Sequence, residues 1–281
     1  MTLAVAAALA AALCFALSTA MHQRAAKQQP PGRTLDPRLL LRLLRTRLWR
    51  LGWIPDVTAT VAQAVALRFG PLALVQPLLS SGLFGAILIE AAWSRQRLQR
   101  RDVAASVIGT AGLVTFLVTV DPRAGVAEPT TTAWWWVAAR VGAVVAICLG
   151  VARLTTGATR GALLGVAAGI LYGVAAALLK AVATRFHGDL LALVVDPRLA
   201  ALVLVALVAV QLNQNAFQSG RLAAPLTALT LAEPVTGIMI GITAFREVLS
   251  LTGARIPLVV VSAAAITTGV WLAGSAPRVK K

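Results

Sequence analysis

The segment GALLGVAAGILYGVAAALLKAVA, residues 161–183, decides the fold class. It contains a single charged side chain, Lys180. A helix needs about 20 consecutive apolar residues to cross the hydrocarbon core of a bilayer. No water is available there, so the backbone must satisfy its own hydrogen bonds, and the segment lacks the alternation of a barrel strand. The segment therefore predicts a transmembrane helix.

Comparable apolar segments recur along the whole chain. Hydrophobic residues make up 58% of the sequence and charged residues 13%, whereas soluble domains carry about 25% charged residues. We therefore predict an all-α integral membrane protein of the cytoplasmic membrane with about nine transmembrane helices. The other expected spans are 2–21, 51–69, 71–93, 103–120, 132–152, 199–218, 221–245 and 254–274.

The charge distribution predicts an orientation. A net charge of +16 would suggest a nucleic-acid partner in a soluble protein. Here the basic residues lie mainly in every second loop, beginning with residues 22–50, so we expect no nucleic-acid partner. Because cytoplasmic loops are enriched in Lys and Arg, the N-terminus is predicted outside and the C-terminus inside.

The basic loop 22–50 allows two interpretations. Its stretch RLLLRLLRTRLWR, residues 38–50, places arginines among leucines, as in a helix lying on an anionic membrane face. The same charges also serve as a topology signal. Anionic lipid is therefore one expected partner of this loop.

An internal repeat predicts two halves. A shift of 150 residues places Gln63 on Asn213, Ala66 on Ala216 and Gly70 on Gly220. We assign residues 1–152 to a first repeat of about five spans and 153–281 to a second of about four. An odd number of spans in the first repeat inverts the second.

Small residues and helix breakers mark how these helices should pack. Stripes of small residues let helix backbones approach closely, and one such stripe runs along 161–173. Glycine and proline interrupt helices, so we expect breaks or hinges at a second set of positions. The packing residues are Gly161, Gly165, Gly169 and Gly173, and the expected hinges are Gly70, Pro71, Gly220 and Pro234.

Polar residues inside the spans are the candidates for a substrate site. Glu233 lies in the middle of an apolar segment, where an ionisable group is costly. It could coordinate a cation, take part in a proton step or brace neighbouring helices. The amides could bind substrate or hold helices together. The amide candidates are Gln211, Gln214, Asn215, Gln63 and Gln76.

Two basic residues lie near the expected external ends of spans. Arg140 and Lys180 are expected to extend outward to the headgroups. The alternative is that one of them pairs with an acidic group or with an anionic substrate.

Two segments resemble a known family. GPLALVQPLLSSGLF (70–84) and AFQSGRLAAPLTALTLAEPVTGIMIGITAFREVL (216–249) are similar to repeat segments of the drug/metabolite transporter superfamily of the EamA type. The span count and the GPL…VQPL pattern resemble its NIPA-like magnesium transporter branch. This resemblance implies a secondary transporter whose substrate is a small metabolite or a divalent cation.

The sequence contains no catalytic or phosphate-binding motif, so we expect neither an enzyme nor a cofactor. The expected function is a secondary transporter or facilitator of a small solute that works by alternating access. A magnesium transporter, with Glu233 as a metal ligand, and a non-transporting scaffold acting through loop 22–50 are the alternatives. The sequence does not decide whether the chain forms a homodimer.

Overall fold

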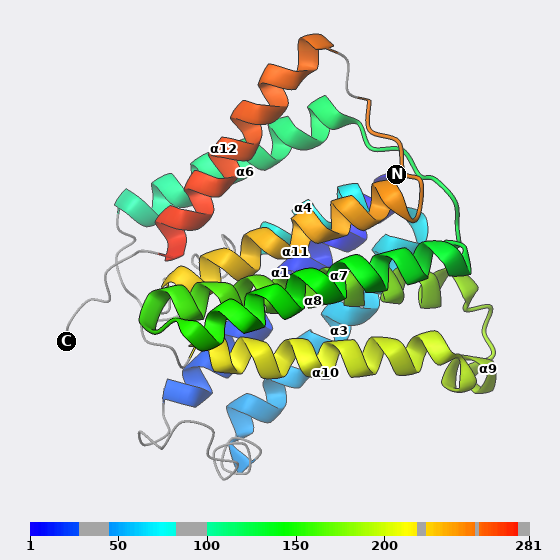
Figure 1. Ribbon diagram of the computed structural model, residues 1–281, viewed down its shortest axis with the longest axis horizontal. Coiled ribbons are helices and arrows are strands. Elements are labelled where there is room, and N and C mark those ends of the chain that lie inside the picture. The colour runs from blue at the N-terminus through cyan, green and yellow to red at the C-terminus, as the bar shows by residue number, and fades with distance from the viewer. Residues whose placement is uncertain (28–44, 83–99, 218–222, 251–252, 275–281) are drawn as a thin grey trace.

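The computed structural model describes residues 1–27, 45–82, 100–217, 223–250 and 253–274, and every regular element there is a helix (Figure 1). An isolated bridge between Arg123 and Val248 is the one β-type pairing in these ranges. The prediction of an all-α chain is therefore confirmed for the described residues. The helices are α1 (Thr2–Lys27), α3 (Arg47–Phe69), α4 (Leu72–Ser80), α6 (Arg100–Val120), α7 (Thr131–Leu154), α8 (Gly157–Arg185), α9 (Leu190–Val195), α10 (Pro197–Phe217), α11 (Ala223–Thr243), the 3₁₀ turn η1 (Gly253–Arg255) and α12 (Ile256–Gly274).

Within the described residues, three helical segments are long and apolar enough to cross a membrane: α7, α8 and the segment 253–272, which comprises η1 and most of α12. Shorter apolar helices lie within α1, α6, α10 and α11. The count of about nine spans goes further than this finding and stays a prediction. The expected span 71–93 lies partly outside the described residues. Helix α9 was not expected, and Asp189 caps it by accepting hydrogen bonds from the backbone N–H groups of Leu191 and Ala192.

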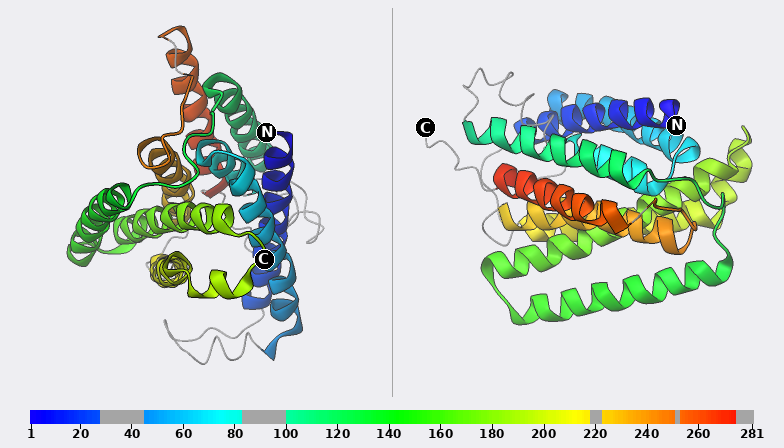
Figure 2. Two further views of the ribbon diagram at one scale, coloured as in Figure 1. Left: turned by 90° about the vertical axis from the view of Figure 1, so that its right-hand side faces the viewer. Right: turned by 90° about the horizontal axis from the view of Figure 1, so that it is seen from above.

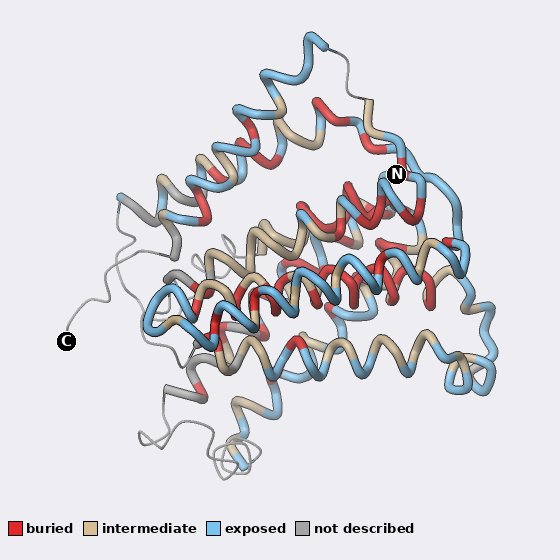
Figure 3. The backbone as a smooth tube through the Cα atoms, in the orientation of Figure 1, coloured by how far each residue is buried: buried red, intermediate tan, exposed pale blue. Residues whose placement is uncertain are grey.

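Helix α8 lies at the centre of the bundle, packed against α11, α10, α7 and α3 (Figures 1 and 2). Its inward surface is buried over most of its length, whereas α7 is exposed along much of its outer side (Figure 3). The N-terminus lies at one end of the bundle, which we call the N-terminal end, and α12 ends at Gly274 toward the other end (Figure 1). Because α8 is central, its surface determines how closely α3, α7, α10 and α11 can pack.

The glycines of α8 explain how closely it approaches α11. A Cβ atom added at Gly169 would lie 2.6 Å from the Leu229 carbonyl oxygen, and one at Gly173 would lie 2.8 Å from the Glu233 carbonyl oxygen. Gly165 meets the backbone of α11 in the same way, and Gly161 is buried. Only glycine fits such contacts, so this stripe fixes the distance between the two helices.

Helices α1 and α3 pack together in one half as α8 and α10 do in the other. The small residues Ala59 and Ala66 of α3 have no exposed surface, and neither do Ala209 and Ala216, which lie 150 positions later in α10. The alanine stripe of α1 is also buried: Ala4, Ala8, Ala12, Ala16 and Ala20. Residues related by the sequence repeat therefore occupy similar environments.

Helices α6 and α12 form a pair that lies beside the rest of the bundle (Figures 1 and 2). Gly112 makes their contact close, because a Cβ atom there would lie 2.8 Å from the Ala265 Cβ atom and 3.0 Å from the Ser262 carbonyl oxygen. One helix comes from each half of the chain. The pair contacts the rest of the bundle mainly through α11 and α4.

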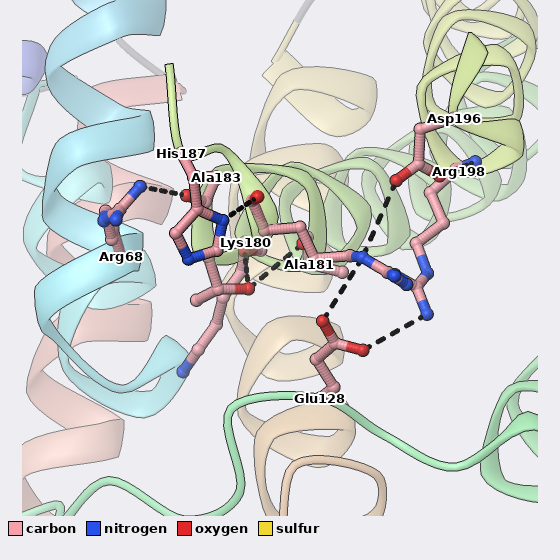
Figure 4. A network of polar contacts seen from close by, with 10 residues as sticks. Arg68, Glu128, Lys180, Ala181, Ala183, His187, Asp196 and Arg198 are labelled. Atoms are coloured by element: carbon pink, nitrogen blue, oxygen red, sulfur yellow. Dashed lines mark hydrogen bonds and ion pairs between the residues drawn. The ribbon is translucent and has the colours of Figure 1, made fainter. Parts of the chain in front are cut away.

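Loops and polar side chains connect the helices at the N-terminal end. The Arg123 N–H donates to the Val248 carbonyl at 2.9 Å, and the Val126 N–H donates to the Phe245 carbonyl at 2.7 Å. Glu128 lies 3.4 Å from both Arg185 and Arg198 (Figure 4). These contacts hold the loop between α6 and α7 against the end of α8, the start of α10 and the chain that follows α11.

Candidate functional site

A buried ion pair lies inside the bundle near its N-terminal end. The Lys180 Nζ atom of α8 is 2.6 Å from the Glu247 Oε1 atom, and the two side chains are 6% and 0% exposed. The expectation that Lys180 extends outward is wrong, because a carboxylate lies within reach inside the protein. Arg140 does lie exposed, with its guanidinium 5.7 Å from the centre of the Trp136 ring.

The carboxylate of Glu247 also completes the beginning of α4. It accepts hydrogen bonds from the backbone N–H of Leu72 at 2.6 Å and of Ala73 at 3.0 Å. The first N–H groups of a helix have no partner within the helix and carry partial positive charge. Lys180 donates a further hydrogen bond to the Gly70 carbonyl at 3.2 Å. The break at Gly70 and Pro71 thus exposes both the donors and the acceptor that the ion pair uses.

The chain that follows α11 places this carboxylate. Helix α11 ends at Thr243, and Arg246 then adopts a left-handed backbone conformation with φ of 54°. The Glu247 N–H donates to the Gly241 carbonyl at 2.9 Å, so the chain folds back along the end of its own helix. Gly241 leaves space for the carboxylate, because a Cβ atom there would overlap it.

Aromatic rings enclose the pair from the side of α7. The ring of Phe245 is fully buried, and its centre lies 4.8 Å from the Lys180 Nζ atom. Trp134 meets this ring edge-on, with the ring centres 6.2 Å apart. A cation over an aromatic face is stabilised by the electrons of the ring. The surroundings therefore exclude water from the pair while partly compensating the ammonium charge.

The ion pair connects the two halves of the chain that the sequence predicts. Gly70, Leu72 and Ala73 belong to the first half, whereas Lys180 and Glu247 belong to the second. Each hydrogen bond from the pair to the break before α4 therefore crosses between halves. This end of the bundle is closed by charged groups that are themselves buried.

Gln76 provides an unsatisfied amide farther along α4. Its side chain is 1% exposed, yet neither Oε1 nor Nε2 has a hydrogen-bond partner among the residues that the structure describes. The side chain packs on Gly237 of α11, where an added Cβ atom would lie 2.6 Å from the Gln76 Cγ atom. A buried polar group without a partner costs about 1–3 kcal/mol. Such a group is retained where it has a use that is separate from stability.

Replacing Gln76 by leucine should stabilise the protein. The change removes two unpaired polar atoms and keeps a similar volume, so we expect the free energy of unfolding to rise by about 1 kcal/mol or more. Reversible unfolding by SDS in mixed micelles measures it. Gln211→Leu is the control, because Gln211 is exposed and should change stability by about 0.5 kcal/mol at most. A loss of stability in Gln76→Leu would show that the amide has a partner.

A second set of polar side chains comes from five helices of the bundle. Tyr172 of α8 shares a side-chain hydrogen bond with Asn213 of α10 and lies within electrostatic range of Glu233 and Asp56. Asp56 in turn accepts a hydrogen bond of 3.1 Å from the fully buried Ser18 hydroxyl of α1. The Asn213 Oδ1 atom is buried without a partner among the described residues. Hydrogen bonds therefore join Tyr172 to Asn213 and Ser18 to Asp56, while Glu233 and Asp56 act on Tyr172 only electrostatically.

The predicted amide side chains differ in how deeply they are buried. Gln63 is buried in α3, Asn215 is half-buried and Gln211 is exposed. The side chain of Gln214 lies outside the described residues, as does Gly220. Asn213 was not singled out as a candidate, although it shares a helix face with the buried Ala209 and Ala216. That spacing of small residues could have identified it.

Glu233 occupies a half-buried position in α11, directly before Pro234, which lies within the helix. In the part of the chain that the structure describes, no three His, Cys, Asp or Glu side chains come together as a metal site would need. The proposed lipid-binding loop lies largely outside the described residues, which resume at Arg45.

Glu247 is the functional candidate that sequence reasoning missed. It lies just beyond the expected span 221–245 and was therefore not considered as a buried group. Lys180 was the available signal, because it is a cation within an apolar segment. The end of that segment and Glu247 are expected on the same side of the membrane. A charge at such a depth requires a partner, and Glu247 is the acid that the fold supplies.

Comparison with known proteins finds a distant relative. An uncharacterized protein from Corynebacterium glutamicum is 29% identical over 246 residues, which cover 87% of this chain and 85% of the relative. No family model matches the sequence. No solved structure matches it either. The resemblance to drug/metabolite transporters therefore rests on the quoted segments.

Proposed function

We propose that this chain is a multi-pass protein of the cytoplasmic membrane that carries a small solute across the bilayer by alternating access. Its two halves would move against each other and expose a site between them first to one side and then to the other. The N-terminal end of the bundle would face outward. The structure would then represent a state in which this outer end is closed.

The observation that carries the proposal is the buried ion pair between Lys180 and Glu247. Removing two charges from water costs several kcal/mol per ion, and mutual attraction recovers this cost only with good geometry. Hydrophobic residues would close the end of a purely structural bundle more cheaply. A pair that bonds across the two halves instead suits a connection that forms in one state and breaks in another.

The inner polar groups support the same function. Gln76 lies between α4 and α11, and Tyr172 with Asn213 lies between α8 and α10. Each therefore occupies a boundary between helices, where a substrate would approach during a movement of the halves. Unpaired amide atoms at Gln76 and Asn213 supply hydrogen-bonding capacity that no protein group uses.

A cysteine accessibility experiment tests the proposal without knowledge of the substrate. Cys14 and Cys148 are first replaced by alanine, and Ile240 of α11, which is 4% exposed, is replaced by cysteine. An impermeant maleimide is then added to intact cells. We expect little labelling with the ion pair intact and an increase of about tenfold with Glu247→Gln, because a broken pair favours an outward-open state.

Val126→Cys is the control in the same experiment, since Val126 is 41% exposed in the loop after α6. It should be labelled equally with either residue at position 247. Equal and low labelling of Ile240→Cys in both backgrounds would reduce the pair to a structural element and remove the support for alternating access. Labelling of Val126→Cys only after cell lysis would reverse the proposed orientation.

A further inference from the structure

A pocket of about 120 Å³ lies between the α6–α12 pair and the helices α4 and α11. Pro77 of α4 and Pro234 of α11 border it, as do Phe116 of α6 and Ile266 of α12. It is separate from the buried ion pair, and neither Gln76 nor Glu233 lines it. The ion pair, Gln76 and Glu233 therefore do not account for this pocket.

The lining is apolar and uncharged. Of the described residues that border the pocket, none carries a formal charge, and most are aliphatic. The hydroxyl hydrogens of Ser80, Ser81 and Thr267 are donated to carbonyls of their own helices, at Gln76, Leu78 and Ala263. Their oxygens retain lone pairs, so the described lining residues offer acceptors and no cationic or anionic partner. A charged ligand would find no ion-pair partner among these residues, and burying an unpaired charge costs several kcal/mol or more.

The volume indicates the size of the group that the pocket can hold. Enclosed apolar cavities of about 150 Å³ remain free of water and bind benzene. A pocket of about 120 Å³ with aliphatic walls, open on one side, therefore suits insertion of a single ring or a branched aliphatic group of similar size. A ligand with one hydroxyl could donate its hydrogen to a free lone pair on the serine or threonine oxygens.

The pocket also lies where movement of the halves would change its shape. Helices α4 and α6 come from the first half of the repeat, and α11 and α12 come from the second. Two of the lining residues are prolines within helices, at positions 77 and 234. Each removes a helical hydrogen bond and permits local bending. A bound ligand would therefore contact both moving parts.

We propose that this pocket binds a small, uncharged and largely apolar molecule of about the size of a benzene ring, with at most one hydrogen-bond donor. The proposal names the substrate class for the transporter function proposed above and rests on that function only in treating the ligand as a substrate. Binding itself can be measured without transport.

The probe is 4-fluorophenol, observed by fluorine NMR with the purified full-length protein in detergent micelles. Two variants form a matched pair: Ala263→Phe fills the pocket, whereas Ala264→Phe adds the same ring at a neighbouring residue that does not line it. Both alanines are exposed positions of α12, so both variants should fold, and their thermal unfolding is compared. The anion 4-fluorobenzoate tests the requirement for a neutral ligand.

We expect saturable binding of 4-fluorophenol to the wild type and to Ala264→Phe, with at least tenfold weaker binding to Ala263→Phe. The anion should show no saturable binding. Equal binding to the two phenylalanine variants, or equal affinity for the anion, would overturn the assignment of this pocket. Such a failure would leave the labelling result at Ile240 unaffected, so the two proposals can fail separately.

Discussion

Replacing Lys180 by methionine is expected to lower the free energy of unfolding by about 3–5 kcal/mol. Methionine is apolar and of similar length, so packing against Phe245 is largely retained. The carboxylate of Glu247, which has no exposed surface, is left without its cation. The backbone N–H groups of Leu72 and Ala73 compensate only part of that charge. Unfolding by SDS in mixed micelles measures the loss.

A double-mutant cycle shows whether the loss belongs to the pair. Lys180→Met combined with Glu247→Gln leaves a neutral amide at the beginning of α4, and we expect it to be more stable than Lys180→Met alone. Arg140→Met is the control for removal of a cation, because Arg140 is exposed, and it should change stability by about 0.5 kcal/mol at most. Equal effects of Lys180→Met and Arg140→Met would contradict the buried pair.

Alanine should have opposite effects at two glycines of the membrane helices. At Gly169 the new Cβ atom would lie 2.6 Å from the Leu229 carbonyl oxygen and 2.9 Å from the Ala232 Cβ atom. We expect α8 and α11 to be forced apart and stability to fall by about 1–3 kcal/mol. At Gly142 of α7 nothing lies within 4 Å of the added atom. There alanine should stabilise the helix by about 0.5–1 kcal/mol.

The measurement for both glycine variants is again the free energy of unfolding in mixed micelles. Gly142→Ala controls for the intrinsic preference of alanine for helices, so the difference between the two variants isolates the contact with α11. If Gly169→Ala were also stabilising, the close approach of α8 and α11 would be wrong. The arrangement of Tyr172 and Glu233 would then need revision too.

The positions of the helices could be predicted because their cause is local. The expected span 161–183 compares with α8 at Gly157–Arg185, and 103–120 compares with α6 at Arg100–Val120. An apolar segment must avoid water wherever it lies in the chain, and a segment of this length satisfies its backbone only as a helix. Neither requirement depends on distant residues.

The site was only partly predictable because its contacts are distant in sequence. Gln76 and Glu233 could be selected as polar residues within apolar segments. The partner of Lys180 lies 67 residues away and is positioned by the left-handed turn at Arg246. Several polar residues near position 213 made the inward face of α10 ambiguous, and packing against α8 selects Asn213. Such choices depend on three-dimensional packing.

The cap on α4 has a consequence for synthesis of the protein. The carboxylate that accepts from Leu72 follows it by 175 residues, and Lys180 precedes Glu247 by 67. At about 5–20 residues per second, the ribosome needs roughly 9–35 s to make the chain between Leu72 and Glu247. During this interval the nascent protein holds an uncapped helix end and, later, an uncompensated ammonium group. The ion pair and the cap of α4 can therefore form only after residue 247 has been made, late in the synthesis of the chain.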